Sequence, residues 1–188
     1  ELFLSGRLVS NATTTVPTEE RRVGMVFQEY ALFPHLRVAD NISFGLQHLS
    51  RGDRRCQVQE MLRLTGLEGF ERRYPHELSG GQRQRVGLAR AIYGDPNFVL
   101  LDEPNSSLDE AGEEALMNTL MSLKARKCTT IVITHRTSVL PAADKILLLR
   151  DGQVAAFGPR DEVLAALRQA NAPRPVPAAA AQAIGGAA

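Results

Sequence analysis

The chain has 188 residues, 44% of them apolar and 23% charged, an ordinary composition for one globular domain with its own core. Its net charge of +1 gives no electrostatic argument for nucleic acid or an acidic membrane as a partner. The apolar runs are too short to span a membrane, the first ten residues are no signal peptide, and two cysteines without metal or redox spacing indicate reduced thiols in the cytosol.

The first third of the chain predicts short strands followed by helices. Residues 1–9 alternate weakly around a Ser-Gly turn, which predicts strand edges, and the chain starts without Met, which indicates a fragment or a processed end. The apolar run at residues 23–28 (VGMVFQ) predicts a buried strand. A first helix is expected from four apolar residues at helical spacing: Val38, Ile42, Leu46 and Leu49.

A second helix is expected after an interruption at residues 50–52. Asp53 is the expected N-cap of this helix, and Gly66 is its expected stop. The buried face of the helix is predicted to consist of three apolar residues: Val58, Met61 and Leu62.

Residues 79–150 alternate between helix and strand patterns. Two helices are predicted, one capped by Ser79 and one capped by Asp109. Their buried residues are expected to be Val86, Ala89, Ile92, Tyr93, Leu116, Leu120 and Leu123. Three apolar runs predict strands at residues 98–101, 129–134 and 145–150. Strands alternating with helices in this order predict a parallel sheet with crossover helices.

The end of the chain predicts one hairpin, one helix and a tail. Asp151 and Gly152 are typical of a tight turn after the third run. A helix over roughly 159–169 would bury Val163, Leu164 and Leu167. Residues 171–188 are rich in Pro and Ala and have too little bulk to pack, so we expect a disordered tail.

Two acidic residues follow the apolar run at residues 98–101. Asp102 and Glu103 would lie at the carboxyl end of a buried strand, where ligands bind in open α/β sheets. Asp102 is placed to hold Mg²⁺, and Glu103 is placed to polarise a water that attacks a phosphoryl group. Considered alone, the same residues could be a strand that simply ends in polar residues at the surface.

The sequence LSGGQ at residues 78–82 makes the phosphoryl interpretation stronger. Ser79 would cap the following helix, while Gly80 and Gly81 would let backbone N–H groups approach an anion at the positive end of the helix dipole. A Gly-Gly turn before a helix is common on its own. Its occurrence about twenty residues before an apolar strand that ends in Asp-Glu is not common.

These motifs resemble those of the ATP-binding subunits of ABC transporters, and the resemblance covers nearly all of residues 1–170. LSGGQ is similar to the signature motif and FVLLDEP (98–104) to the Walker B strand. Ser107-Leu108-Asp109 is similar to the D-loop, Thr134-His135 to the switch histidine and Phe27-Gln28 to the Q-loop. The resemblance implies an α/β P-loop NTPase core of the RecA type with a parallel sheet, and an α-helical subdomain over about residues 36–82.

In that family two cassettes enclose two ATP molecules, so the resemblance implies ATP hydrolysis coupled to transport. Glu103 would act as general base, and His135 would steady the γ-phosphate. Asp102 and Gln28 would hold Mg²⁺. The γ-phosphate held by the partner subunit would contact the signature residues Ser79, Gly80, Gly81 and Gln82.

The same resemblance implies the partners and the location of the chain. Gln28 would link the metal and the attacking water to transmembrane permease subunits. Asp109 would bridge to a second ATPase subunit, in a homodimer or a heterodimer. The implied location is cytoplasmic, peripheral on the inner face of the plasma membrane, and no nucleic acid is implied as a partner.

One expected motif is absent from these 188 residues. None of the fifteen glycines is followed by Lys, so the Walker A sequence G-x-x-x-x-G-K-[ST] that cradles the phosphates does not occur. The N-terminal part of the core is therefore expected to be missing. We accordingly expect the isolated chain to be incompetent for ATP binding, and to expose apolar surface that the complete fold buries.

The direction of transport is left open by the motifs. Residues 19–46 and 72–82 resemble importer ATPases for iron(III), polyamines or sulfate, whereas residues from Ser79 onward resemble ATPases of type I secretion exporters. Import is favoured, because residues 28–77 carry the docking surface for the membrane subunits. The alternatives are a type I secretion ATPase, a non-catalytic module that donates its signature motif in trans, and a cassette acting in DNA repair or translation.

Four arginines give weaker signals. Arg83, Arg85 and Arg90 could reach phosphate, but on a helix they are expected to pair with surface acids. Arg37 stands where the resembling importers usually have Thr as a helix cap, which predicts a weakened helix start.

Overall fold

The structure is a computed structural model that describes residues 1–4, 6–27, 29–45 and 50–171. The chain divides into two compact units, the first at Glu1–Ala142 and the second from Ala143 onward. None of the helices in the described part of the chain is long and apolar enough to cross a membrane.

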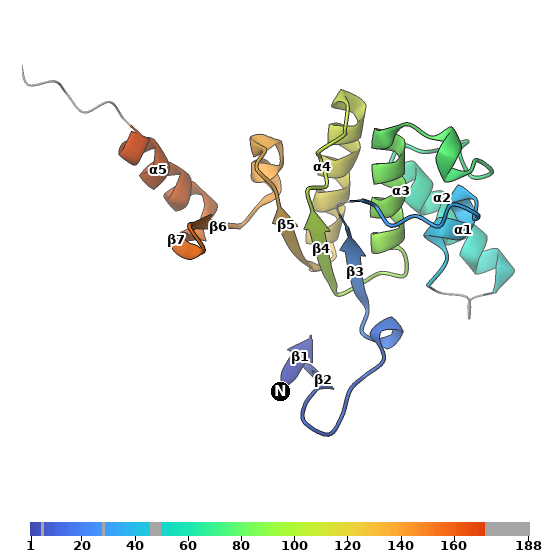
Figure 1. The fold of residues 1–188 in the computed structure, drawn as a ribbon, viewed down its shortest axis with the longest axis horizontal. Helices are drawn as coiled ribbons and strands as arrows, with labels where there is room; N and C mark the ends of the chain where they lie inside the picture. Colours follow the sequence, from blue (N-terminus) through green and yellow to red (C-terminus); the bar gives the residue numbers. More distant parts are fainter. Residues whose placement is uncertain (5, 28, 46–49, 172–188) are drawn as a thin grey trace, which may run out of the picture. The chain divides into compact units, whose positions relative to one another are not determined.

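A three-stranded parallel sheet forms the centre of the first unit (Figure 1). Its strands are β3 (Val23–Val26), β4 (Phe98–Asp102) and β5 (Thr129–Ile133), with β4 in the middle. The pairs are in continuous register, with Val23 opposite Phe98 and Phe98 opposite Thr129. The predicted parallel sheet, with residues 98–101 as its central strand, is thus confirmed.

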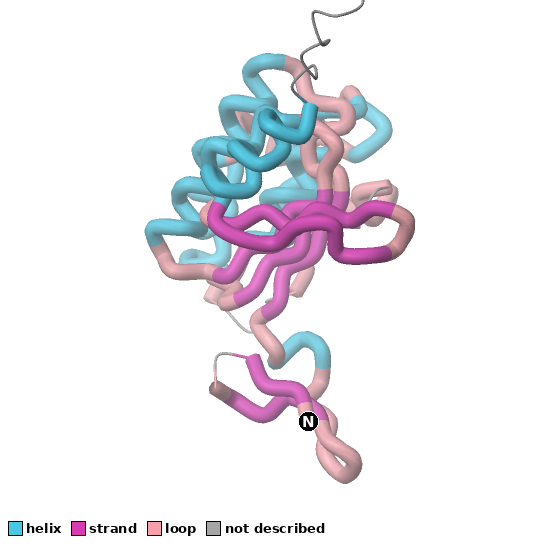
Figure 2. The backbone as a smooth tube through the Cα atoms, turned by 90° about the vertical axis from the view of Figure 1, so that its left-hand side faces the viewer, coloured by secondary structure: helices cyan, strands magenta, loops and turns pink. Residues whose placement is uncertain are grey.

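Two long helices cover one face of this sheet (Figures 1 and 2). They are α3 (Gly80–Ile92) and α4 (Glu110–Ala125). The predicted inward residues of both helices are buried, together with Val26, Val99 and Leu101 from the strands. Gly24 lets α3 approach β3 closely, because a Cβ atom at this position would lie 1.9 Å from the Ala91 carbonyl oxygen.

The other face of the sheet is largely exposed. Alternate residues of β3 and β5 point to it, and Val23, Met25, Ile131 and Ile133 are 42%, 40%, 47% and 51% exposed. The expectation that residues 23–28 form a fully buried strand is therefore wrong for the described residues. Only every second side chain reaches the helices, because successive side chains of a strand point to opposite faces.

The small helical part of the first unit contains α1 (Val38–Ile42) and α2 (Arg51–Leu64). α1 ends earlier than predicted, because the chain turns at Ser43–Gly45 and the Ser43 hydroxyl bonds back to the Ala39 carbonyl at 3.0 Å. Leu46 and Leu49, predicted on the same helix, lie outside the described residues. As expected from Arg37, the start of α1 has no side-chain cap.

The predicted start of α2 needs a correction. Its N-cap is Ser50, whose hydroxyl accepts a hydrogen bond from the Asp53 backbone N–H at 3.1 Å. Asp53 is in the first turn instead, where its carboxylate accepts from the Ser50 hydroxyl at 2.7 Å. Residues 51–52 therefore do not interrupt the helix but begin it. The predicted buried face and the stop at Gly66, with φ +64°, are both confirmed.

Shorter elements complete the first unit. The predicted N-terminal strand edges form an antiparallel hairpin of β1 (Leu2–Leu4) and β2 (Arg7–Ser10). Three short 3-10 helices lie at Thr18–Glu20, Pro75–Glu77 and Thr137–Ala142.

The second unit is an antiparallel hairpin followed by a helix. β6 (Lys145–Arg150) pairs with β7 (Gln153–Pro159), and α5 spans Arg160–Asn171. The turn residues Asp151 and Gly152 both have positive φ, as tight hairpin turns require. The third predicted parallel strand, residues 145–150, is therefore observed in this antiparallel pair. The predicted tail, apart from its first residue, lies outside the described residues.

Candidate functional site

Glu103 and His135 meet at the carboxyl ends of two neighbouring strands. Glu103 directly follows β4, and its backbone N–H donates to the Ile133 carbonyl of β5 at 2.9 Å. Its side-chain Oε1 lies 3.0 Å from Nδ1 of His135, two residues beyond the end of β5. Parallel strands bring their carboxyl ends to one edge of the sheet, which explains why residues 32 positions apart in sequence are in contact.

The second carboxylate oxygen of Glu103 has no partner among the described residues. Oε2 is buried and makes no hydrogen bond to them, and such an atom calls for a water, an ion or a ligand group. Asp102, half-buried at the last position of β4, precedes it in the chain. Two adjacent carboxyl groups of this kind suit a hard cation such as Mg²⁺. No group of three or more His, Cys, Asp or Glu side chains among the described residues forms a complete metal site.

The signature sequence forms the start of α3. The Ser79 hydroxyl accepts from the Gln82 backbone N–H at 3.2 Å, and the Gln82 side chain accepts from the Ser79 backbone N–H at 3.0 Å. This reciprocal capping box confirms Ser79 as the N-cap. Ser79 and Gly80 are exposed, so the positive end of a helix of 13 residues faces outward.

The two glycines of the signature sequence pack against the loop before α4. A Cβ atom at Gly81 would lie 2.7 Å from the Ser107 carbonyl oxygen, and one at Gly80 would lie 3.8 Å from Ser107 Cβ. Gly81 therefore has a packing role inside this chain, in addition to any role in exposing N–H groups to an anion.

Two further predicted site residues have different outcomes. Asp109 is the N-cap of α4, and its Oδ1 accepts from the Gly112 backbone N–H at 2.9 Å. The predicted role of Asp109 as a helix cap is thus confirmed. Its contact with a second ATPase subunit stays a prediction. Gln28, predicted to contact metal and water, lies outside the described residues.

Sequence reasoning missed two buried amide side chains beside the site. Asn105 is fully buried, accepts from the Thr134 hydroxyl at 3.0 Å and donates to the Ser138 hydroxyl at 3.1 Å. Gln84 is only 1% exposed and bonds to the loop after β4. Helical spacing could have indicated Gln84, because it lies one turn before the buried residue Leu88 on the inward face of α3.

The prediction that the arginines of α3 pair with acids is wrong within the described residues, where none of the three forms an ion pair. The Arg83 guanidinium donates to the Pro75 carbonyl at 2.9 Å, and the Arg85 guanidinium donates to the Gly66 carbonyl at 2.9 Å. Arg90 donates to the carbonyls of Tyr30 and Ala31 at 2.8 Å, and burial lowers the pKa of its guanidinium. These carbonyls belong to turns and helix ends, where backbone acceptors lack helical or sheet partners.

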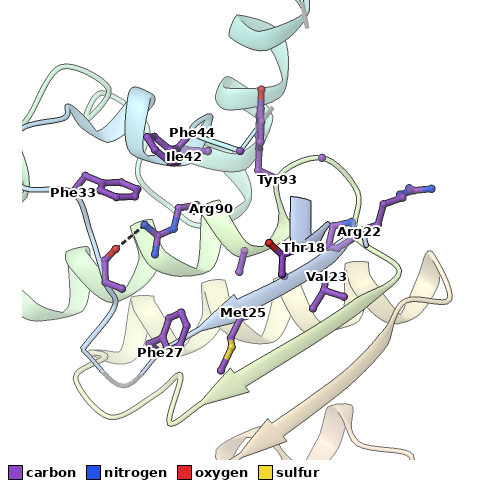
Figure 3. Close-up of a pocket in the computed structure, with 16 residues that line it drawn as sticks. Thr18, Arg22, Val23, Met25, Phe27, Phe33, Ile42, Phe44, Arg90 and Tyr93 are labelled. Atoms are coloured by element: carbon purple, nitrogen blue, oxygen red, sulfur yellow. Dashed lines mark hydrogen bonds between the residues drawn. The ribbon is translucent and has the colours of Figure 1, made fainter. Parts of the chain in front are cut away.

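A cavity of about 560 Å³ lies away from Glu103 and His135. β3, α3 and residues 31–45 line it (Figure 3). Four aromatic side chains line it, together with apolar and polar ones: Phe27, Phe33, Phe44 and Tyr93. Burial raises the pKa of the Tyr93 phenol, whose hydroxyl has no hydrogen-bond partner in the described structure.

The curated relatives described here are named as ATP-binding proteins of transport or import. A family model described as ABC transporter matches residues 2–106. The glycine betaine transport ATP-binding protein OpuAA of Bacillus subtilis is 39% identical over 169 residues, covering 87% of this chain and 40% of the relative. The sulfate/thiosulfate import ATP-binding protein CysA of Mycobacterium tuberculosis is 43% identical over 154 residues, covering 80% and 44%. The Fe(3+) ions import ATP-binding protein FbpC 1 of Rhizobium meliloti is 41% identical over 165 residues, covering 85% and 47%.

The chain thus spans less than half the length of these curated relatives. Among solved structures, the ATP-binding cassette MJ0796, a dimer bound to ADP and Pi, matches with a TM-score of 0.70 and 34% identity. This match covers 76% of the present chain and 66% of that cassette. A family model over more than half of the chain and a fold shared with a solved cassette lead to one conclusion: the chain belongs to the ABC transporter family, as an ATP-binding domain.

Proposed function

We propose that this chain is the nucleotide-binding part of an importer ATPase that works as a dimer on transmembrane permease subunits. Three relatives named for import or transport support import. The OpuAA alignment covers 87% of the chain and takes in both the part that resembles importers and the part that resembles type I secretion ATPases. Iron(III), polyamines and sulfate remain the proposed substrate classes, and the proposed location is the inner face of the plasma membrane.

The single observation that carries the proposal is the pairing of Glu103 with His135. One carboxylate oxygen of Glu103 lies 3.0 Å from His135, while the other is buried without a partner in the described part of the chain. A general base needs a carboxylate oxygen that is oriented yet free to accept a proton from water. Glu103 is the proposed base, and His135 is proposed to orient it and to contact the γ-phosphate.

Asp102 is the proposed ligand for Mg²⁺ in this chain, together with Gln28. A bound Mg²⁺ would neutralise charge that develops on the phosphate oxygens. The orphaned oxygen of Glu103 and the neighbouring Asp102 carboxylate fit such an ion by their chemistry.

The signature residues Ser79, Gly80, Gly81 and Gln82 are proposed to contact ATP that the second ATPase subunit holds. The exposed start of α3 supports this role, because backbone N–H groups at a helix N-terminus attract phosphate. Asp109 is proposed to lie at the contact between the two subunits. The proposed cassette comprises residues 1–170, with residues 36–82 as its helical subdomain.

Docking of the permease subunits is proposed at residues 28–77. The aromatic cavity supports this, since Phe33 and Phe44 of this segment line it and their rings lie 4.2 Å apart. Open apolar hollows edged by polar groups are typical of sites that bind another protein.

The isolated chain is proposed not to bind ATP, because its 188 residues contain no Gly-Lys pair for a phosphate-binding loop. The alternative is a non-catalytic module that docks a permease and donates its signature sequence to a complete partner. Titration of the purified chain with fluorescent ATP, with and without Mg²⁺, tests the first statement. Glu103→Gln serves as the matched variant, since it should trap ATP in a competent site.

Two outcomes of this titration have different meanings. Absence of binding in both proteins supports a chain that needs another segment to hold the phosphates. Tight Mg²⁺-dependent binding that increases in Glu103→Gln would mean that residues within this chain supply the phosphate contacts, and the proposed incompetence would be wrong.

A further inference from the structure

Glu103 has a backbone conformation that needs support. Its φ is +48°, in the left-handed region that residues with a Cβ seldom adopt. Its N–H donates to the Ile133 carbonyl at 2.9 Å, so β5 holds the amino side of the residue. The direction of the Glu103 side chain depends on this conformation, and something must also hold its carbonyl side.

The carbonyl side of Glu103 is held by Gln84 of α3. The side-chain Nε2 of Gln84 donates to the Glu103 carbonyl at 2.8 Å and lies 3.2 Å from the Ser106 hydroxyl. Its Oε1 accepts from the Ser107 backbone N–H at 3.1 Å. One carboxamide thus contacts both ends of the loop at residues 103–107.

The burial of Gln84 makes these three bonds important. Its side chain is only 1% exposed, so a lost partner could not be replaced freely by solvent. Gln84 bonds to the Glu103 carbonyl, the Ser106 hydroxyl and the Ser107 N–H, and the Glu103 carbonyl also accepts from the Ser106 backbone N–H at 3.2 Å. A side chain of this kind specifies one arrangement of the chain segments that it joins.

The helix that carries Gln84 also carries the signature sequence. Gln84 lies five residues after Ser79, on a single helix that begins at Gly80. The capped start of α3 faces outward, whereas Gln84 faces the loop that contains Glu103. A rigid helix therefore connects the signature residues to the backbone of the hydrolytic carboxylate within one chain.

We propose that Gln84 is a positioning residue, whose buried carboxamide fixes the loop at residues 103–107 to the signature helix and thereby sets the position of the Glu103 carboxylate. The catalytic part of this inference rests on the proposed function, in which Glu103 is the general base. The contact itself also links the place where one ATP would be hydrolysed to the helix end that would contact the other.

Asn105 holds the opposite side of the same loop and provides a contrast. It bonds to Thr134 and Ser138, and Arg136 donates to the Ser106 carbonyl at 3.1 Å. These contacts tie the loop to the segment that contains His135. The loss of Gln84 should therefore release the loop from α3 without releasing it from this segment.

Amide hydrogen exchange of the full chain, measured by mass spectrometry, tests the proposal without requiring ATP. In Gln84→Met, exchange of residues 103–109 should become about fivefold faster, as expected for the loss of a typical buried hydrogen bond. Exchange within α4 should remain unchanged. Gln84→Glu should have at least as large an effect, because its carboxylate can still accept from the Ser107 N–H but places a buried negative charge against the Glu103 carbonyl oxygen.

Gln59→Met is the matched control, since Gln59 is exposed on α2 and its side chain donates to the Glu71 carboxylate at 3.2 Å, away from the loop at residues 103–107. The proposal is overturned if residues 103–109 exchange at the wild-type rate in Gln84→Met. It is also overturned if every segment becomes faster by the same factor, because Gln84 would then only stabilise the fold.

A kinetic measurement tests whether Gln84 affects ATP hydrolysis by positioning Glu103. In a reconstituted transporter whose wild-type form hydrolyses ATP, Gln84→Glu should lower kcat and leave KM unchanged, as expected of a group that orients the base. A change of KM alone would overturn the positioning role. A wild-type transporter that stays inactive even when a segment carrying a phosphate-binding loop is supplied would count against the proposed function, whereas the exchange experiment would still decide whether Gln84 holds the loop.

Discussion

At the scale of single residues, the site depends on atoms that lie far apart in the sequence. Glu103 is held from β5 through its N–H, from α3 through its carbonyl and from His135 through its side chain. Each of these bonds is ordinary by itself. Together they maintain a left-handed backbone conformation at the residue proposed as the general base.

The packing of the core at Gly24 also depends on a contact with a residue far away in the sequence. A Cβ atom at this position would lie 1.9 Å from the Ala91 carbonyl oxygen of α3, and a backbone atom cannot move aside as a side chain can. We expect Gly24→Ala to lower the free energy of unfolding by roughly 1–3 kcal/mol, the usual cost of overpacking. Urea unfolding followed by circular dichroism measures this change.

Gly45→Ala is the control for that prediction. A Cβ atom at Gly45 would meet no atom within 4 Å, so its free energy of unfolding should stay close to that of the wild type. Equal stability of Gly24→Ala and Gly45→Ala would show that α3 does not approach β3 as closely as described.

At the scale of elements, the ends of the helices are determined by short local patterns. Ser79 and Asp109 were predicted as caps, and both accept the expected backbone hydrogen bond. The start of α2 was placed wrongly because Ser50 and Asp53 are both good caps three residues apart. Only the geometry shows that the Ser50 hydroxyl receives the N–H of Asp53, rather than Asp53 capping the helix itself.

This difference can be measured in α2. Ser50→Ala should lower the free energy of unfolding by about 1 kcal/mol, because the first turn loses its side-chain acceptor. Asp53→Ala should cost about 0.5 kcal/mol, because it removes only a favourable charge and a partner of Ser50 at the helix start. Thermal unfolding of both variants provides the comparison, and a larger loss in Asp53→Ala would restore Asp53 as the cap.

At the scale of the whole molecule, the sheet of the first unit has one covered and one exposed face. The apolar surface expected to be exposed is present on the described residues, with Ile131 and Ile133 about half exposed. Exposed apolar surface of this kind promotes association. The wild-type chain is therefore expected to bind the dye ANS and to form aggregates when concentrated.

Replacing Ile131 and Ile133 by Thr should reduce ANS fluorescence and increase the monomer fraction in size-exclusion chromatography. Thr keeps the β-branched shape that suits a strand and removes apolar surface. Val99→Thr is the control on the covered face, where the side chain is fully buried. It should lower stability by about 1–3 kcal/mol through burial of a hydroxyl, without improving solubility. Unchanged ANS binding in the double variant would mean that the apolar surface that binds the dye does not include Ile131 and Ile133.

The candidate site was only partly predictable. Asp102, Glu103, His135 and the signature residues could be proposed from the sequence because their motifs combine residue type with fixed spacing. Gln84 and Asn105 belong to the same arrangement but were missed, because an amide among apolar neighbours has no chemical pattern of its own until its partners are known. The arginines of α3 were assigned acidic partners for the same reason, since backbone carbonyls cannot be recognised as partners from residue type.

The sequence by itself determined the family resemblance, the order of strands and helices, and most helix ends, because these depend on motifs, apolar periodicity and capping residues within a few positions. The tertiary structure alone decided which face of the sheet is covered, that residues 145–150 belong to a separate two-stranded sheet, and how Gln84 holds Glu103. These features depend on how segments far apart in the sequence pack, or on whether another element covers a surface. No local pattern records such contacts, because burial and hydrogen bonding are properties of the packed chain.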